Sequence, residues 1–173
     1  TLEHAKEACS SLCEAIATHG LSVGLVHGNR SQAQRQLAIK RFAEGGYKVA
    51  MLARDAENLK ALEKNIEQAF AFPCDVGDLD LLLKTIKQVK EKLGHPEVVI
   101  HNALRSVRGG ILELDPDDLE RNFRVNTTAL LHLARETLPA MIDAGRGAIL
   151  VTGNTSATRG KTNWGFFAST KAA

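Results

Sequence analysis

An aromatic ring and an ammonium group lie one helical turn apart near the end of the chain, in Phe167-Ala168-Ser169-Thr170-Lys171. Residues at i and i+4 share one face of a helix, so the Phe167 ring and the Lys171 amine are predicted to point into the same space. A phenyl ring has no proton to transfer. Two roles are open for Phe167: packing against a sheet, as aromatic helix residues usually do, or lining a ligand pocket beside the lysine without acid–base work.

The segment before this helix ends in small and polar residues, in Gly147-Ala148-Ile149-Leu150-Val151-Thr152-Gly153-Asn154. Its apolar run predicts a strand that leads into a loop. Asn154 lies thirteen positions before Phe167. An amide at this place donates hydrogen bonds but does not readily shuttle a proton.

Strands and helices are predicted to alternate along the whole chain. The predicted strands cover 21–26, 47–53, 69–72, 97–101 and 145–151. The predicted helices cover 32–43, 56–68, an amphipathic stripe from Leu79 to Leu93, a long helix over 116–143 with Asp115 as its N-cap, and the segment that contains Phe167. Pro139 is expected to interrupt and kink the long helix.

Short connections between alternating elements predict an α/β fold with a doubly wound, Rossmann-like parallel sheet. No shift in composition marks a linker, so one domain is expected over 1–173. Residues 1–20 are expected to form an N-terminal helical extension of that domain.

Composition limits the class of protein. The chain has 173 residues, of which 44% are apolar, and a net charge of +2 from 22 basic and 20 acidic side chains. This balance is typical of a soluble globular protein and indicates no nucleic acid partner and no membrane partner. No apolar stretch approaches the roughly 20 residues that span a bilayer, and residues 1–20 lack the apolar region of a signal peptide.

Three cysteines, Cys9, Cys13 and Cys74, form an odd and sparse set, which predicts a reducing, cytoplasmic location. Cys9 and Cys13 are four apart on a predicted helix, so a pair of metal ligands is one interpretation. No second pair at metal spacing follows. The favoured interpretation is two small apolar residues on a packed helix face, and no metal is predicted.

The strand, the loop and the aromatic-x-x-x-Lys helix together resemble the catalytic segment of short-chain dehydrogenases/reductases. Further matches follow in the order of that family: Gly28 after the first strand, Asp75-Val76 after the third, Asn102-Ala103 after the fourth, and Asn126 in the long helix. Each match is weak by itself. Their order and spacing over residues 21 to 173 identify the chain as a member of the family.

The resemblance implies a nicotinamide cofactor at the carboxyl ends of the strands. Gly28 corresponds to the first glycine of the family's phosphate-binding loop, while Gln32 and Gln34 occupy two later glycine positions, so a turn that binds no phosphate is the alternative. Arg54, with Arg30, suits the 2′-phosphate of NADP, and NAD is the less favoured cofactor. A solvated arginine at a helix start is the alternative for Arg54. The resemblance further implies cofactor contacts from Asp75, Val76, Asn102, Ala103 and Lys171.

The implied catalytic positions are Phe167, Asn154, Lys171 and Asn126. The family has a tyrosine where this chain has Phe167 and a serine where it has Asn154. Ser156 would face the same side as Asn154 if the strand persisted, and would then replace the missing serine. The single tyrosine, Tyr47, lies at the start of a predicted strand, opposite the strand end that builds the site. The tyrosine-dependent mechanism is therefore not available to this chain.

These residues imply an NADP(H)-dependent oxidoreductase that transfers hydride between the cofactor and a small carbonyl or alcohol substrate. One alternative is a pseudoenzyme, a non-catalytic subunit that binds nucleotide or a partner; another is an enzyme in which water or a substrate group supplies the proton. The family's dimers imply a homo-oligomer formed through the helix over 116–143. The family's domain continues past the lysine, so its last two strands are expected to be lacking and the strand over 145–151 to form an exposed edge.

Overall fold

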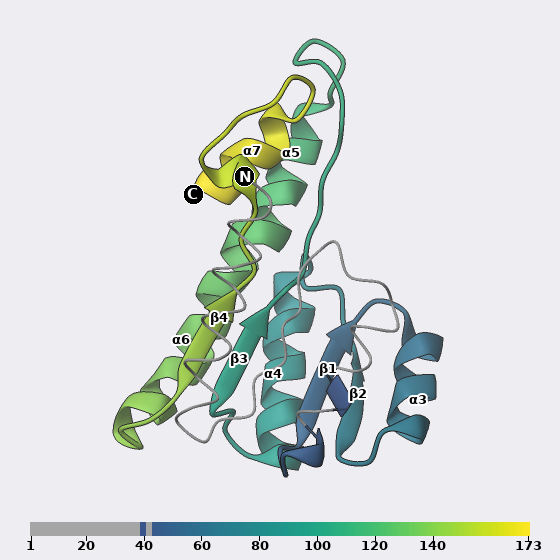
Figure 1. Cartoon of the computed structure of the whole chain (residues 1–173), viewed down its shortest axis with the longest axis vertical. Coiled ribbons are helices and arrows are strands. Elements are labelled where there is room, and N and C mark those ends of the chain that lie inside the picture. The colour runs from purple at the N-terminus through teal and green to yellow at the C-terminus, as the bar shows by residue number, and fades with distance from the viewer. Residues whose placement is uncertain (1–38, 41–42) are drawn as a thin grey trace. The chain divides into compact units, whose positions relative to one another are not determined.

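The computed structural model describes residues 39–40 and 43–173 (Figure 1). The predicted strand over 21–26, most of the predicted helix over 32–43 and the predicted N-terminal extension lie outside the described residues. The chain divides into two compact units, residues 1–51 with 55–72 and residues 52–54 with 73–173. The two units are described separately.

The first unit is built around one helix, α3 (Ala56–Asn65), and the greater part of two strands, β1 (Val49–Ala53) and β2 (Ala69–Pro73). Asp55 begins the helix because its carboxylate accepts a hydrogen bond from the Asn58 amide at 3.0 Å. Apolar side chains from the helix, the strands and the turn between α3 and β2 form the core of the unit: Met51, Leu59, Ile66 and Ala69.

The strands β1 and β2 hydrogen-bond to each other. At one end the Val49 amide donates to the Gln68 carbonyl at 2.7 Å, and at the other the Cys74 amide donates to the Ala53 carbonyl at 2.9 Å. Residue numbers rise in the same direction along both strands, so the pair is parallel, as the sequence predicts.

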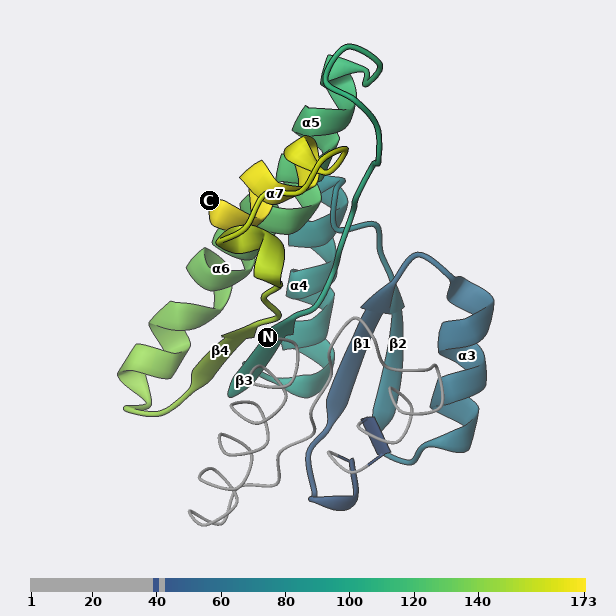
Figure 2. The ribbon, with the colours of Figure 1, turned by 45° about the horizontal axis from the view of Figure 1, so that its top comes forward.

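The second unit carries the remaining elements (Figure 2). They are α4 (Leu79–Leu93), β3 (Val98–His101), α5 (Pro116–Phe123), a π-helical turn (Arg124–Thr128), α6 (Ala129–Asp143), β4 (Ala148–Val151), a 3₁₀ turn (Thr155–Ala157) and α7 (Gly165–Ala172). The strands β3 and β4 pair in parallel, with His101 opposite Val151. A parallel pair needs a crossover connection, and the helices between the two strands supply it.

The helices α4 and α6 lie side by side against this strand pair (Figure 2). Lys90 of α4 and Glu136 of α6 join them with a 2.6 Å ion pair. Beneath the helices lies the core of the unit: Cys74, Leu82, Ile86 and Ala129, with Leu52, Val76 and Leu133 packed against them. The parallel strands, the helical crossover and the helix-covered core are those of the predicted Rossmann-like α/β fold.

The long helix differs from the prediction. Its start is as expected, because Asp115 accepts a hydrogen bond from the Asp117 amide at 3.0 Å and Pro116 takes the first helical position. The expected interruption at Pro139 is wrong, since α6 continues through that residue to Asp143. The helical pattern changes earlier, at the π-helical turn, whose residues also form hydrogen bonds with β3 and α7.

The strand β4 is shorter than predicted. It begins at Ala148, after Gly145 and Gly147, whose φ angles of 62° and 152° favour glycine. Within the described residues β4 has β3 as its only neighbour, and Leu150 and Val151 are exposed. Among the described strands, β4 therefore forms an edge.

Candidate functional site

Lys171 lies on α7 and is half-buried. Its ammonium group donates a hydrogen bond to the Thr152 carbonyl, just past the end of β4, at 3.2 Å. Desolvation by burial lowers the pKa of this ammonium. The helix thus brings a partly desolvated cation to the carboxyl end of a parallel strand, where ligands bind in folds of this class.

Asn126 lies in the π-helical turn and is buried. Its side-chain NH₂ group donates to the Arg105 carbonyl and to the Thr170 hydroxyl, both at 2.8 Å. Its side-chain oxygen accepts from the Arg105 amide at 2.9 Å. One side chain therefore joins the crossover helix, the loop after β3 and α7, and it contacts the residue directly before Lys171.

Thr127 strengthens the same junction. Its hydroxyl donates to the Thr170 carbonyl at 3.1 Å. The Thr170 hydroxyl in turn donates to the Phe167 carbonyl at 2.9 Å. Adjacent residues of the π-helical turn thus hold the side chain and the backbone of Thr170, which fixes the last turn of α7 that carries the lysine.

The Phe167 ring is 4% exposed. It packs edge-on against Trp164, with ring centroids 5.9 Å apart and an interplanar angle of 63°. The structure thus shows a buried ring in contact with Trp164, and a part for that ring in a ligand pocket stays a prediction.

Asn154 is exposed and lies outside the strand, three residues after β4 ends. Its side-chain oxygen accepts a hydrogen bond from the Ser156 amide at 2.6 Å, which caps the 3₁₀ turn Thr155–Ala157. The prediction that Ser156 faces the same side as Asn154 along a persisting strand is wrong, because the backbone coils into this turn instead.

The sequence reasoning missed His101, the last residue of β3, whose side chain is buried. The ring atom Nε2 lies 3.0 Å from the Val125 carbonyl in the π-helical turn. Burial lowers the pKa of His101, the Val125 hydrogen bond opposes that shift, and the Lys171 charge lowers the pKa further. A histidine closing a buried strand is itself a signal, because a buried imidazole needs a hydrogen-bond partner.

Arg105 was also missed. Its backbone pairs with Asn126, and its guanidinium binds Asp118 of α5 at 2.6 Å. The loop that follows β3 is therefore attached to the crossover helix at two places. Nothing in the sequence pattern distinguishes this arginine from the solvated ones.

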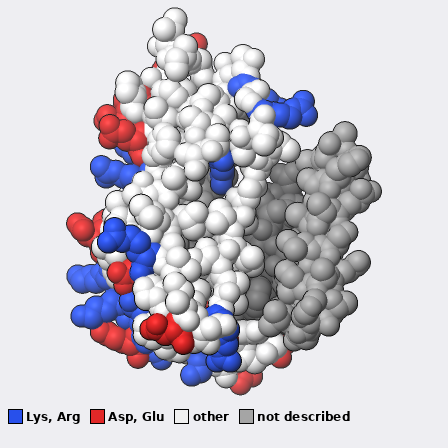
Figure 3. Space-filling model, turned by 90° about the vertical axis from the view of Figure 1, so that its left-hand side faces the viewer, with Lys and Arg blue, Asp and Glu red and all other residues white. Residues whose placement is uncertain are grey.

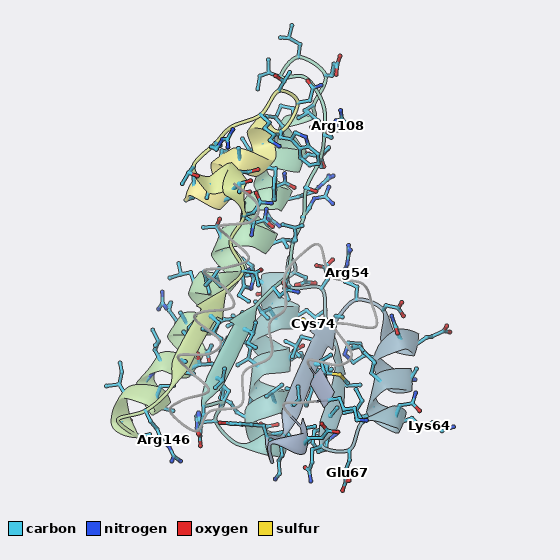
Figure 4. The ribbon with its side chains drawn as sticks, in the orientation of Figure 1. Arg54, Lys64, Glu67, Cys74, Arg108 and Arg146 are labelled. Atoms are coloured by element: carbon cyan, nitrogen blue, oxygen red, sulfur yellow. The ribbon has the colours of Figure 1, made fainter. Side chains whose placement is uncertain are left out.

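Of the predicted cofactor residues, Gly28 and Arg30 lie outside the described residues. Arg54 follows β1, is exposed and has no ion pair among the described residues (Figure 4). Asp75 follows β2, and its carboxylate accepts a hydrogen bond from the Gly77 amide at 2.9 Å. The remaining ones are Val76, which packs on the core, and Asn102 with Ala103, which are half-buried after β3.

The donors of these residues suit a dinucleotide. The exposed Arg54 guanidinium can bind a phosphate with two hydrogen bonds. The Lys171 ammonium has three donors, and the described residues use one of them, at Thr152. Arg54, Asp75 and Asn102 each follow the carboxyl end of a strand. The residues present therefore fit a nicotinamide dinucleotide.

The described residues contain neither a candidate metal site nor a candidate membrane span. Among residues 39–40 and 43–173 no three histidine, cysteine or acidic side chains gather at metal-binding distance. Cys9 and Cys13 lie outside these residues, while Cys74 is buried and burial raises the pKa of its thiol. In the same part of the chain, no helix has the length and apolar character needed to cross a membrane.

Known proteins are similar to this chain in sequence. A family model described as short chain dehydrogenase matches residues 22–173. The fatty acyl-CoA reductase of Acinetobacter baylyi is 30% identical over 157 residues, which cover 87% of this chain and 53% of the relative. The versicolorin reductase of Emericella nidulans is 31% identical over 112 residues, which cover 65% of this chain and 42% of the relative.

Solved structures share the fold. A short-chain dehydrogenase from Streptomyces avermitilis superposes with a TM-score of 0.75 at 27% identity, covering 88% of this chain and 56% of that one. A metagenomic short-chain oxidoreductase in complex with NADP gives a TM-score of 0.73 at 27% identity, covering 87% and 70%. The chain spans about half the length of the curated relatives it matches. Because the family model matches most of its length, this chain belongs to the short-chain dehydrogenase/reductase family of oxidoreductases.

Proposed function

We propose that this chain binds NADP(H) as part of an oxidoreductase that acts on a small carbonyl or alcohol compound. One observation carries the proposal: Lys171 is held at the end of β4 and is connected through Thr170 to Asn126. These contacts join the positions that correspond to the family's ribose-binding lysine and helix asparagine, which supports the proposal. The metagenomic relative crystallised with NADP, at 27% identity, supports the same class of cofactor.

The proposed binding residues contact different parts of the cofactor. Lys171 donates hydrogen bonds to the nicotinamide ribose, and Arg54 binds the 2′-phosphate that distinguishes NADP from NAD. Asp75 and Val76 contact the adenine, while Asn102 and Ala103 form the wall after β3. Gly28 lies in the loop that approaches the pyrophosphate, and Arg30 adds a second charge at the 2′-phosphate.

The bound cofactor would supply the hydride for reduction of a carbonyl, and the reaction also needs a proton donor. Phe167 has no group that donates one, and the Asn154 amide is engaged in capping a turn. A general acid is typically worth about 10²–10⁴-fold in rate. The proton therefore comes from water or from the substrate, and turnover is slow relative to a tyrosine-containing relative.

Titration of NADPH fluorescence with the purified chain tests the binding. Binding enhances the fluorescence, and Arg54→Gln weakens NADPH binding about tenfold or more because a phosphate loses a bidentate cation. Arg146→Gln is the matched control, since Arg146 lies just before β4, away from its carboxyl end (Figure 4). NADH binding should change little in either variant. Absence of any enhancement for the unaltered chain at high concentration overturns the proposal.

The non-catalytic alternative also has a specific observation in its favour. Phe167 is packed against Trp164, and Asn154 serves as a cap, so both positions that lost a hydroxyl now have structural roles. A chain that binds NADPH and turns over no carbonyl compound would be a nucleotide-binding pseudoenzyme. We also propose that the chain forms a homo-oligomer through the helices over 116–143.

A further inference from the structure

We propose that His101 is a positioning residue: its Nε2–H group holds the π-helical turn against the end of β3 and so sets the place of Asn126 and of the α7 turn that bears Lys171. This role does not require the proposed cofactor, because every contact that carries it is between residues of the chain itself.

The Val125 carbonyl lies in the π-helical turn and does not have its α-helical partner. In an α-helix this oxygen would accept a hydrogen bond from the Ala129 amide four residues on. Here the Ala129 amide donates to the Arg124 carbonyl instead, as a π-helical turn requires. The change of pattern takes the α-helical donor away from the half-buried Val125 carbonyl. A carbonyl has two lone pairs, so it can accept a hydrogen bond from a side chain.

The His101 side chain provides a hydrogen-bond donor for this carbonyl. His101 is 3% exposed, and its Nε2 atom lies 3.0 Å from the Val125 carbonyl. A carbonyl only accepts, so Nε2 carries the hydrogen. The imidazole thus supplies a donor to the Val125 carbonyl, and the bond fixes the ring's tautomer.

The same turn leads to the site. The residue after Val125 is Asn126, whose amide binds the Arg105 backbone and the Thr170 hydroxyl. If the turn returned to a regular α-helix, the residues after it would rotate about the helix axis and these three bonds could not all persist. Holding Val125 therefore holds Asn126, and Asn126 holds Thr170 beside Lys171.

Two substitutions of His101 separate the hydrogen bond from the bulk of the ring. Glutamine has a side-chain NH₂ group that can reach the same carbonyl, whereas leucine fills space and donates nothing. His95→Leu is the matched control, because His95 is exposed in the loop before β3. Each variant is compared with the unaltered chain by amide hydrogen exchange and by the NMR signals of the Asn126 side-chain NH₂ group.

We expect His101→Leu to quicken exchange of the Thr128 and Ala129 amides about tenfold, the equivalent of one hydrogen bond. The Asn126 NH₂ signals should lose their protection in the same variant. His101→Gln should restore both, and His95→Leu should change neither. Exchange in α4, within the same unit, serves as the reference for general destabilisation.

Two results overturn the inference. One is that His101→Leu leaves the Asn126 signals and the turn amides unchanged. The other is that exchange quickens equally in α4 and in the turn, with no rescue by glutamine, since that pattern denotes a core residue with only a packing role. Because the readout uses no cofactor, a failure to bind NADPH in the earlier titration leaves this test intact.

Discussion

At the scale of single residues, the site keeps its framework while two of its family's hydroxyl groups are absent. Lys171 and Asn126 were expected together from the resemblance, and the structure connects them through Thr170. His101 and Arg105 were not expected, because their importance depends on partners 24 and 21 residues away. A sequence pattern indicates spacing along a strand or helix, and it does not indicate which carbonyl of a π-helical turn binds a distant side chain.

Restoring the hydroxyls tests how much of the catalytic pocket remains. Phe167→Tyr combined with Asn154→Ser returns a proton donor and a hydrogen-bonding hydroxyl, so we expect NADPH-dependent reduction of small aldehydes or ketones to rise about 10²–10⁴-fold over the unaltered chain. The measurement is NADPH oxidation in the presence of substrate. Phe166→Tyr is the matched control, because Phe166 is also buried on α7 and precedes the reactive position by one residue. No increase in a double variant that still binds NADPH would contradict the prediction.

The buried imidazole of His101 makes stability depend on pH. Burial lowers its pKa from the ordinary 6.5, and the nearby Lys171 charge on α7 acts in the same direction. Between the lowered pKa and 6.5 the unfolded chain binds more protons than the folded one, so the free energy of unfolding rises with pH across that window. As pH falls below about 6.5, the unaltered chain should therefore lose stability relative to His101→Gln.

Urea unfolding of the two proteins at neutral pH and at about pH 5 measures this difference. The exposed His95→Gln variant is the control and should track the unaltered chain at both values. A His101→Gln variant that loses stability in parallel with the unaltered chain would show that the imidazole does not charge on unfolding.

At the scale of elements, and for the part of the chain that the structure describes, sequence patterns predicted the strands and helices well and their interruptions poorly. The N-caps Asp55, Asp78 and Asp115 all accept backbone hydrogen bonds, and local chemistry of this kind lies within the sequence. Pro139 was expected to disturb the long helix, yet the change occurs at the π-helical turn, whose partners come from β3 and α7. Local rules place helix ends, and tertiary contacts place irregular turns.

The approach to β4 depends on one glycine. Gly147 has a φ of 152°, and a Cβ atom there would come within 2.5 Å of Met141 Cγ and 2.7 Å of Met141 Cβ. Gly147→Ala should therefore lower the free energy of unfolding by roughly 1–3 kcal/mol, through backbone strain and overpacking. Gly153→Ala is the matched control, since nothing lies within 4 Å of a Cβ there and its φ lies outside the strained range. Equal stability of the two variants, measured by denaturant unfolding, would refute this account of the turn.

At the scale of the whole molecule, the chain corresponds to about half the length of its curated relatives. The surface feature that bears on assembly is an exposed apolar face of the second unit. Figure 3 views the side of the second unit where α6 and β4 lie, and uncharged atoms cover much of the middle of that face. The exposed apolar residues of α6 are Leu131, Leu138 and Ile142. Their spacing of seven and four places them on one stripe of the helix.

That stripe is the structural basis for the proposed homo-oligomer. Introducing charge on the stripe, and separately in a control loop, tests it. Leu131 and Ile142 are 57% and 72% exposed, so replacing them should leave the fold intact while placing charge in a buried interface. We expect Leu131→Glu with Ile142→Glu to weaken self-association about 100-fold or more, as light scattering across a concentration series would measure. Leu112→Glu is the matched control, because Leu112 is 97% exposed in the loop before α5 and lies off the α6 stripe. An oligomer that survives the paired α6 change, or that dissociates equally with the loop change, would place the interface elsewhere than on this helix.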